Sequence, residues 1–471
     1  MKGRARIAHI IIGPALYALS VGLLSEPLTR EAAEAVGLLA WMVYWWVTRP
    51  VHMTVTAFLP MVMNAVFAYT DQATVVAQYF SESILLIFGT FLLTIPWEKT
   101  GFDRRIALKI LSIVGPSITS QIIVWMTASI LLSTVLPNLA VCALFSPIAV
   151  AMLKAAGYDD IPSCKQAVPI LLVIGWGAGI GGVGTPIGGA MNVTAITILQ
   201  EHLGIEVMYV DWVVRLLPYL LVVSVCCIAA VILMHRGLAP IEGTRSYFAD
   251  EYAKLGKISR DEVVSGALFG LGLAACFARP LYSAALPSLA PAYVMVGLGL
   301  VTFFITCADG APLQTWETAQ RKTMWGMMLL FGGGLALGKV ISASGASEVI
   351  ANLALGMHLD GGFTTIVFFA VLAVFLSEVT SSTVSAAICV PILLALTDSL
   401  GVDPIPYWFS LIMAYNGQFL LPISVLAVPC SYGIDPAAML RRGGVLLAVK
   451  LTCAVGVGWL CMQLWPGFGA L

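Results

Sequence analysis

The sequence predicts an all-α membrane protein that crosses the bilayer many times and contains two inverted repeats. Its 471 residues are 59% hydrophobic and only 10% charged. A soluble chain could not bury that much apolar surface, and several runs exceed the roughly 18 apolar residues that indicate a membrane helix. The third observation is a pair of interrupted apolar segments, 131–152 and 374–396, that follow the same plan.

Each interrupted segment has a short tip that is polar or breaks the helix. The two tips are Pro137-Asn138-Leu139 and Ser381-Ser382-Thr383. The second tip follows the first by 244 residues, and the same spacing relates Ser377 to Ser133, Pro391 to Pro147 and Gly345 to Gly101. Broken hydrophobic segments repeated in two halves are typical of secondary transporters, with the binding site where the breaks meet.

The remaining apolar runs give the order of the membrane segments. We expect spans at 7–24, 33–48, 51–70, 81–96, 212–234, 262–279, 290–307, 324–341 and 441–465, hairpins at 119–153 and 364–397, and broken spans at 169–200 and 407–433. If both hairpins are re-entrant, about eleven transmembrane spans remain. The chain then divides into 1–80, a first repeat at 81–234, a linker at 235–261, further spans at 262–323 and a second repeat at 324–471.

Charge in the loops predicts the orientation. Lys2, Arg4 and Arg6 precede the first span, which we interpret as a retained helix with a cytoplasmic amino terminus rather than as a signal peptide. With that start, the basic linker is cytoplasmic and the acidic loop at 201–211 is external. The first hairpin then opens from the cytoplasm and the second from outside, so the repeats are inverted, which is the basis of alternating access.

The tips carry the predicted chemistry. A non-helical break at bilayer depth persists only if protein or a wet cavity satisfies its backbone groups. Helix amino termini there attract anions, while carbonyls and hydroxyls are ligands for a small cation. The alternative is that Pro137 is a simple kink and the serines are packing hydroxyls. The glycine-rich run 177–189 and its mate 416–433 cannot be uninterrupted helices, although close helix packing is the alternative there.

These motifs, together with Gly181-Gly182-Val183-Gly184-Thr185 and Asp211-Trp212, resemble the divalent anion sodium symporter family of the ion transporter superfamily. The resemblance implies an elevator-type homodimer in which 1–80 and 262–323 form a scaffold. Both hairpins and both broken spans would form the moving transport domain. Such proteins carry di- and tricarboxylates or sulfate with Na⁺, and some are exchangers.

The resemblance also implies a site. The substrate residues would be Asn138, Leu139, Gly189, Asn192, Ser381, Ser382 and Thr383, and the sodium residues Ser133, Pro137, Asn138, Gly184, Ser377, Thr380, Ser382 and Val425. The chain departs from the family pattern at the first tip, where Pro137 and Leu139 replace hydroxyl residues. We therefore expect a substrate that is smaller, less charged or more apolar than succinate.

The predicted function is sodium-coupled uptake of a small organic anion across the plasma membrane. An anion exchanger, or a cation/proton or arsenite-type antiporter of similar architecture, is the alternative. We find no motif of an intramembrane enzyme, and the net charge of -1 gives no reason to expect nucleic acid. Glu378, three residues before the second tip, is either an ion-pathway residue or a brace for the hairpin, and we favour the brace. Lys339, Arg104 and Arg105 are expected to cap helix ends or to extend to the interface, and the alternative is that they steer the anion or pair with acidic scaffold groups.

Overall fold

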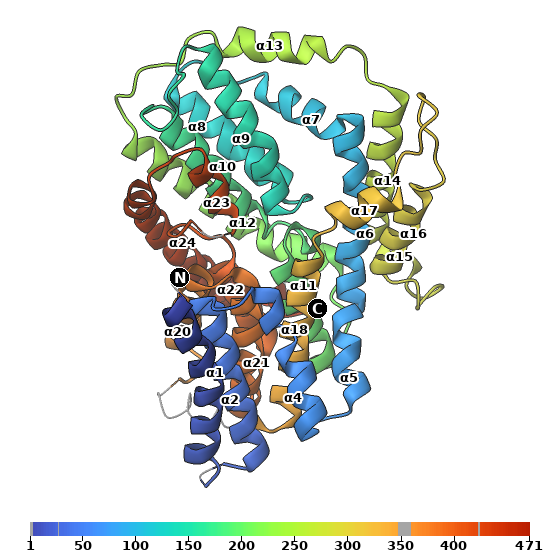
Figure 1. Cartoon of the computed structure of the whole chain (residues 1–471), viewed down its shortest axis with the longest axis vertical. Helices are drawn as coiled ribbons and strands as arrows, with labels where there is room; N and C mark the ends of the chain where they lie inside the picture. Colours follow the sequence, from blue (N-terminus) through green and yellow to red (C-terminus); the bar gives the residue numbers. More distant parts are fainter. Residues whose placement is uncertain (1–2, 27, 347–358, 423) are drawn as a thin grey trace.

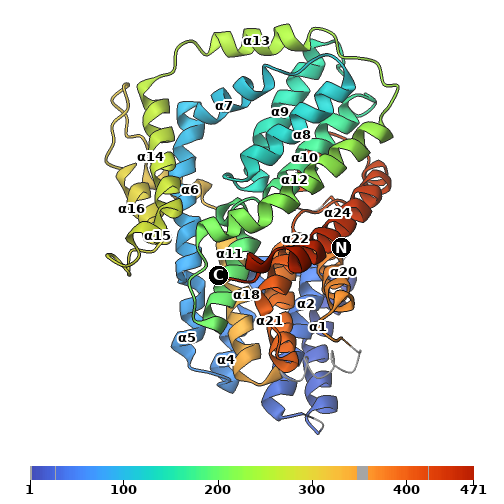
Figure 2. The ribbon, with the colours of Figure 1, turned by 180° about the vertical axis from the view of Figure 1, so that it is seen from behind.

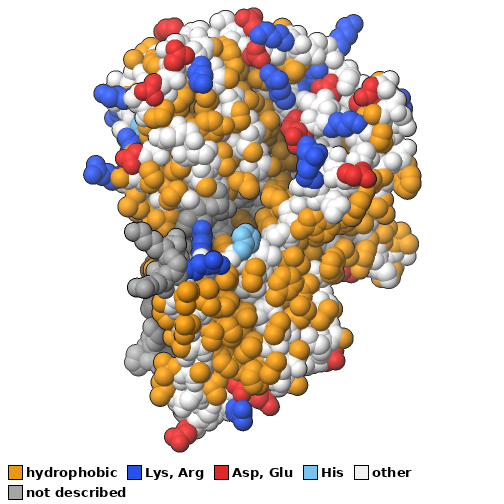
Figure 3. All heavy atoms as spheres, viewed as in Figure 1, with side chains coloured by type: hydrophobic (Ala, Val, Ile, Leu, Met, Phe, Trp, Pro, Cys, Tyr) orange, Lys and Arg blue, Asp and Glu red, His pale blue; other side chains and the backbone are white. Residues whose placement is uncertain are grey.

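The computed structural model describes residues 3–26, 28–346, 359–422 and 424–471, and it is helical throughout that part of the chain, apart from one isolated bridge between Thr306 and Pro312. Seven of the described helices are long and apolar enough to cross a membrane, and shorter apolar helices accompany them. Hydrophobic side chains cover much of one face, whereas charged side chains gather mainly toward its upper part and at its lower end (Figure 3). The predicted all-α, multi-span membrane class is confirmed.

The chain begins with helices that precede the first repeat. They are α1 (Gly3–Leu24), α2 (Arg30–Thr48), α3 (Met53–Thr56), α4 (Leu59–Phe67) and α5 (Gln72–Ala77). The span expected at 51–70 is thus two short helices. Pro60 lies in the first turn of α4 and has no N–H to donate to Thr56 O, which favours a break between α3 and α4.

The first repeat and the linker follow. The helices are α6 (Glu82–Thr100), α7 (Phe102–Leu111), α8 (Ile118–Ser133), α9 (Asn138–Ala155), α10 (Ala167–Gly181), α11 (Ala190–Leu203), α12 (Tyr209–Met234) and α13 (Thr244–Lys254). Arg105 is buried, and its Nε lies 2.7 Å from Glu262 at the start of α14. Arg104 pairs with Glu251 of α13 at 3.0 Å. Both arginines therefore fasten the linker region by ion pairs instead of extending to the interface.

The remaining helices complete the chain. They are α14 (Arg260–Phe277), α15 (Arg279–Tyr282), α16 (Pro291–Val301), α17 (Trp316–Lys322), α18 (Trp325–Ala343), α20 (Phe363–Val379), α21 (Ser382–Leu400), α22 (Pro404–Tyr415), α23 (Ala427–Ser431) and α24 (Pro436–Leu464). The span expected at 290–307 ends early, at Val301, where the Thr302 hydroxyl donates to Gly299 O. Most of the chain between Gly345 and the second hairpin lies outside the described residues.

The two repeats have matching geometry. α6 and α18 each contain 19 residues and are followed by Gly101 and Gly345, whose φ angles of 80° and 74° are left-handed. Glycine adopts that conformation without strain, and both helices end within two residues of it, α6 at Thr100 and α18 at Ala343. The hairpin α8–α9 lies in the upper half of the molecule, and the second leg of the other hairpin, α21, lies in the lower half (Figures 1 and 2). This arrangement brings the tips together near the middle.

Candidate functional site

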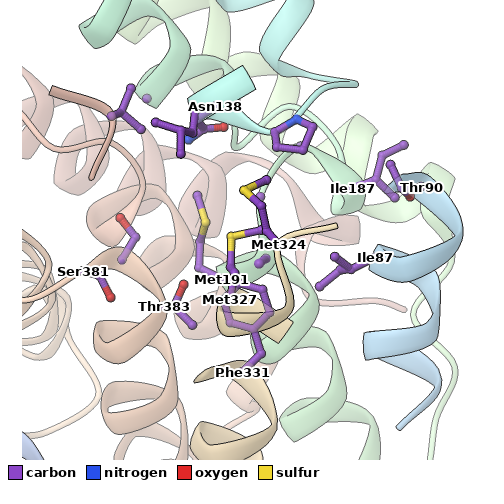
Figure 4. A pocket seen from close by; sticks show the side chains of 18 of the residues that line it. Ile87, Thr90, Asn138, Ile187, Met191, Met324, Met327, Phe331, Ser381 and Thr383 are labelled. Atoms are coloured by element: carbon purple, nitrogen blue, oxygen red, sulfur yellow. The ribbon is translucent and has the colours of Figure 1, made fainter. Parts of the chain in front are cut away.

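The two tips meet at a cavity of about 150 Å³. Residues from six parts of the chain line it, and they are Ile87, Thr90, Phe91, Pro137, Asn138, Leu139, Gly179, Ile187, Gly188, Gly189, Ala190, Met191, Met324, Met327, Phe331, Ser381, Ser382, Thr383, Gly417, Gln418 and Val425. Figure 4 shows the polar side chains of Asn138, Ser381 and Thr383 to one side and the methionines nearer its centre. The predicted meeting of the two breaks is therefore present.

Three helix amino termini border this cavity. α9 starts at Asn138, α21 at Ser382 and α11 at Ala190, and all three residues are part of the lining. The first amides of a helix have no partner within the helix, and they carry the positive end of its dipole. At the second tip, the Ser381 hydroxyl accepts a bond from Val384 N at 3.2 Å, which fixes the start of α21. The cavity thus favours a negatively charged group.

Behind the first tip, helix carboxyl termini converge on one hydroxyl. Ser133, the last residue of α8, is fully buried, and its Oγ lies 2.8 Å from Asn138 Oδ1 and 2.7 Å from Ala178 O in the last turn of α10. A serine hydroxyl has one proton, so it cannot donate to both oxygens. The surplus of oxygen lone pairs at two negative helix ends suits a small hard cation.

The second tip repeats this arrangement. Ser377 is fully buried in the last turn of α20, and its Oγ lies 3.0 Å from Ser382 Oγ and 2.7 Å from the carbonyl of Tyr415, the last residue of α22. Both serines therefore join their own tip to the first half of the neighbouring broken span. The equal spacing in the sequence corresponds to equal contacts in space.

The glycine-rich break supplies further carbonyls at the first tip. A Cβ on Gly188 would lie 2.8 Å from Gly182 O, 2.9 Å from Ser133 O and 3.1 Å from Thr134 O, so only glycine fits among these oxygens. Asn192 is fully buried, and its Nδ2 donates to Gly182 O at 2.6 Å and to Thr185 O at 2.9 Å. Asn192 therefore holds the break in shape and is not part of the cavity wall.

The second break is held by a buried acid and a buried base. Glu378 accepts bonds from Phe419 N at 2.9 Å and from Leu420 N at 3.0 Å. Fully buried Lys450 donates to Gly417 O at 2.7 Å and lies over the Phe419 ring. The contacts of Glu378 are those expected of a brace.

Most of the predicted site residues border the cavity. The substrate residues that line it are Asn138, Leu139, Gly189, Ser381, Ser382 and Thr383, and the additional sodium residues are Pro137 and Val425. Ser133 and Ser377 lie directly behind the tips, as described above. Gly184 and Thr380 are buried outside the lining, next to Thr134 and at the end of α20 respectively.

Other residues at the site were not anticipated from the sequence. Met191, Met324, Met327 and Phe331 form much of the wall, and only the helical spacing of the last three could have suggested a common face. Arg49, at the end of α2, places Nη2 3.4 Å from Thr380 O at the second tip. An arginine after an apolar run resembles an interfacial anchor, so no feature of the sequence indicated this contact.

Paired hairpins whose tips meet at an anion-attracting cavity inside a bundle of membrane helices define a secondary transporter, not an enzyme. The family model of the citrate transporter, CitMHS, matches residues 43–414. The chain belongs to this family of transporters. The resemblance to the divalent anion sodium symporters, noted from the motifs, is confirmed.

Similar proteins agree with this assignment. The chain is 27% identical over 471 residues to the sodium-dependent dicarboxylate transporter SdcS of Staphylococcus saprophyticus, covering 96% of this chain and 89% of the relative. The SdcS protein of Staphylococcus aureus strain USA300 is 26% identical over 466 residues with the same coverage. Among solved structures, the YdaH transporter of Alcanivorax borkumensis, described as having an unusual topology, matches with a TM-score of 0.53 at 13% identity. That match covers 83% of this chain and 88% of the other, and it supports the fold alone.

Proposed function

We propose that the protein is a sodium-coupled transporter that takes up a small organic carboxylate by an elevator mechanism. The observation that carries the proposal is that helix amino termini and helix carboxyl termini lie on different sides of each tip. Helix amino termini border the cavity, whereas helix carboxyl termini meet at Ser133 and Ser377 behind it. The first arrangement suits an anion and the second suits Na⁺. The names of the Staphylococcus relatives support the same pairing of ions.

Coupling has a physical reason in this site. Among the described residues that line the cavity there is no lysine, arginine or histidine, so helix dipoles and polar groups must hold the anion. Because Ser133 and Ser377 each contact a tip residue, a cation at either serine would also fix the tip in shape. A bound Na⁺ would thus contribute both positive charge and an ordered tip to anion binding.

The larger arrangement follows the predicted division of the chain. In this proposal 1–80 and 262–323 form the scaffold of a homodimer, and both hairpins with both broken spans move as the transport domain. The amino terminus and the 235–261 linker face the cytoplasm. Ion pairs join α7, which precedes the first hairpin, to α13 of the linker and to α14 of the proposed scaffold, and they support a linker that is held in place at this end of the molecule.

The test is uptake of labelled carboxylates into proteoliposomes with an inward Na⁺ gradient or with Na⁺ replaced by choline. We expect uptake only with Na⁺, and we expect Asn138→Ala and Ser382→Ala to abolish it without loss of folding. Ser246→Ala is the matched control, because this exposed hydroxyl on α13 donates to Gly243 O and has no other hydrogen bond within the described chain. Uptake that is indifferent to Na⁺, or normal uptake by both tip variants, would contradict the proposal.

A further inference from the structure

The wall of the cavity is chemically one-sided. Opposite the second tip it is formed by the apolar side chains of Met191, Met324, Met327 and Phe331, with Ile87 farther across (Figure 4). These residues belong to α6, α11 and α18 or precede them directly, so the apolar wall does not come from the hairpins. A ligand that reaches the second tip must therefore place its other end against thioethers and hydrocarbon.

The first tip adds few polar side chains to compensate for this apolar wall. Pro137 has no N–H, and Leu139 is 40% exposed and presents an isobutyl group to the cavity. Asn138 is the one polar side chain of this tip, and its Oδ1 is already in contact with Ser133 at 2.8 Å. The Met191 thioether lies 2.5 Å from the point where a Cβ on Gly189 would be, so it covers the backbone there.

Both tips offer the free amides of a helix start, but the side chains of the second tip, unlike those of the first, add hydroxyl donors. The amides of Ser382 and Thr383 open α21, and the Thr383 hydroxyl has no partner among the described residues. Two backbone donors and one hydroxyl match the two oxygens of a single carboxylate. A second carboxylate directed away from the helix amino termini would lie against the methionines, where an unpaired charge is strongly disfavoured.

Building on the proposed function, we propose that the substrate is a monocarboxylate with a compact apolar body, held by its carboxylate at Ser382 and Thr383. Its body fills the space between Leu139, Met191 and Met327. A cavity of about 150 Å³ is large enough for a benzene-sized group. Methionine adapts to ligands of different shape and makes favourable contacts with aromatic rings. Aromatic or branched aliphatic monocarboxylates are therefore the expected class.

The test compares benzoate, cyclohexanecarboxylate and succinate by isothermal titration calorimetry with the purified full-length protein, in NaCl and in choline chloride. Binding is measured instead of uptake because protonated benzoate crosses lipid bilayers unaided. We expect both monocarboxylates to bind in Na⁺ at least roughly tenfold more tightly than succinate. Tighter binding of succinate would overturn this inference while leaving sodium-coupled carboxylate transport intact.

Two variants test the wall directly. Leu139→Thr combined with Pro137→Ser restores donors to the first tip, and Met327→Thr makes the wall polar; both should move the affinity ratio toward succinate by about tenfold. Met462→Thr, in α24 and outside the cavity lining, should leave the ratio unchanged. Unchanged ratios in well-folded tip and wall variants would refute the assignment. Benzoate binding of equal affinity with and without Na⁺ would support the substrate class and contradict sodium coupling. If none of the three acids binds, both the substrate class and the coupling are overturned.

Discussion

The buried pair of Glu378 and Lys450 should behave as one unit, because both hold residues 417–420 of the second break. Glu378 accepts from the amides of Phe419 and Leu420, and Lys450 donates to Gly417 O. In Glu378→Gln an oxygen at the Oε2 position can still accept from both amides, but the new NH₂ group then faces Phe419 N, so the bond that Oε1 accepts and the negative charge are lost. That loss is worth about 1.5–3 kcal/mol, and leaving Lys450 uncompensated raises the cost to about 3–5 kcal/mol.

The double variant separates this explanation from two independent effects. Lys450→Met alone leaves Glu378 as an uncompensated buried charge, whereas Glu378→Gln with Lys450→Met removes both charges. We expect the double variant to lose about 1–2 kcal/mol less stability than the sum of the single variants. Equilibrium unfolding in mixed detergent micelles, followed by tryptophan fluorescence, gives the three free energies. Strict additivity would refute the view that acid and base compensate each other across residues 417–420.

Three further outcomes are expected. Ser377→Ala should raise the Na⁺ concentration for half-maximal uptake by roughly tenfold, with maximal uptake little changed, since one cation ligand is lost; an unchanged Na⁺ titration would remove this hydroxyl from the ion site. Gly188→Ala should lower the thermal unfolding midpoint and abolish stabilisation by Na⁺, because the new Cβ would enter the cluster of carbonyl oxygens. Gly444→Ala is the control, and because the space around its Cβ is open, it should leave the midpoint unchanged or raise it slightly. A hydrogen bond from Lys254, with Arg104 nearby, holds the pKa of Glu251 below its usual range. The contribution of Glu251 to stability is complete above the pKa of the unfolded carboxyl group and is lost as the pH falls through its lower pKa in the folded state. Protection of the amides of 244–254 from hydrogen exchange should therefore fall below about pH 4, and Glu251→Gln should make that protection less dependent on pH.

The sequence predicted the features that depend on local breaks in a helix. The tips, the left-handed Gly101 and Gly345, and the prolines within α9 and α21 all appear where the spacing placed them. Each of these is a property of a few neighbouring residues, because a missing N–H or a missing Cβ acts on the backbone at that point.

Features that depend on the direction of a side chain could not be predicted in the same way. Asn192 follows the glycine run and was expected at the substrate, but it turns inward to the carbonyls of Gly182 and Thr185. The buried partner of Arg105 lies 157 residues away, and periodicity does not select one distant acid among several. The apolar wall could not be predicted for the same reason, because α6 and α18 meet only in the folded molecule.

The placement of the two serines behind the tips has a consequence for how such a protein can diversify. Ser133 and Ser377 make equivalent contacts even though the tips in front of them carry different side chains. The supporting layer and the exposed layer of each hairpin are therefore separable, and mutations at Pro137 or Leu139 need not disturb the carbonyls deeper inside. The two hairpins therefore give related proteins two binding surfaces that can change independently on the same supporting structure. Substrate selectivity can change through mutations at one tip while the other tip keeps its binding residues.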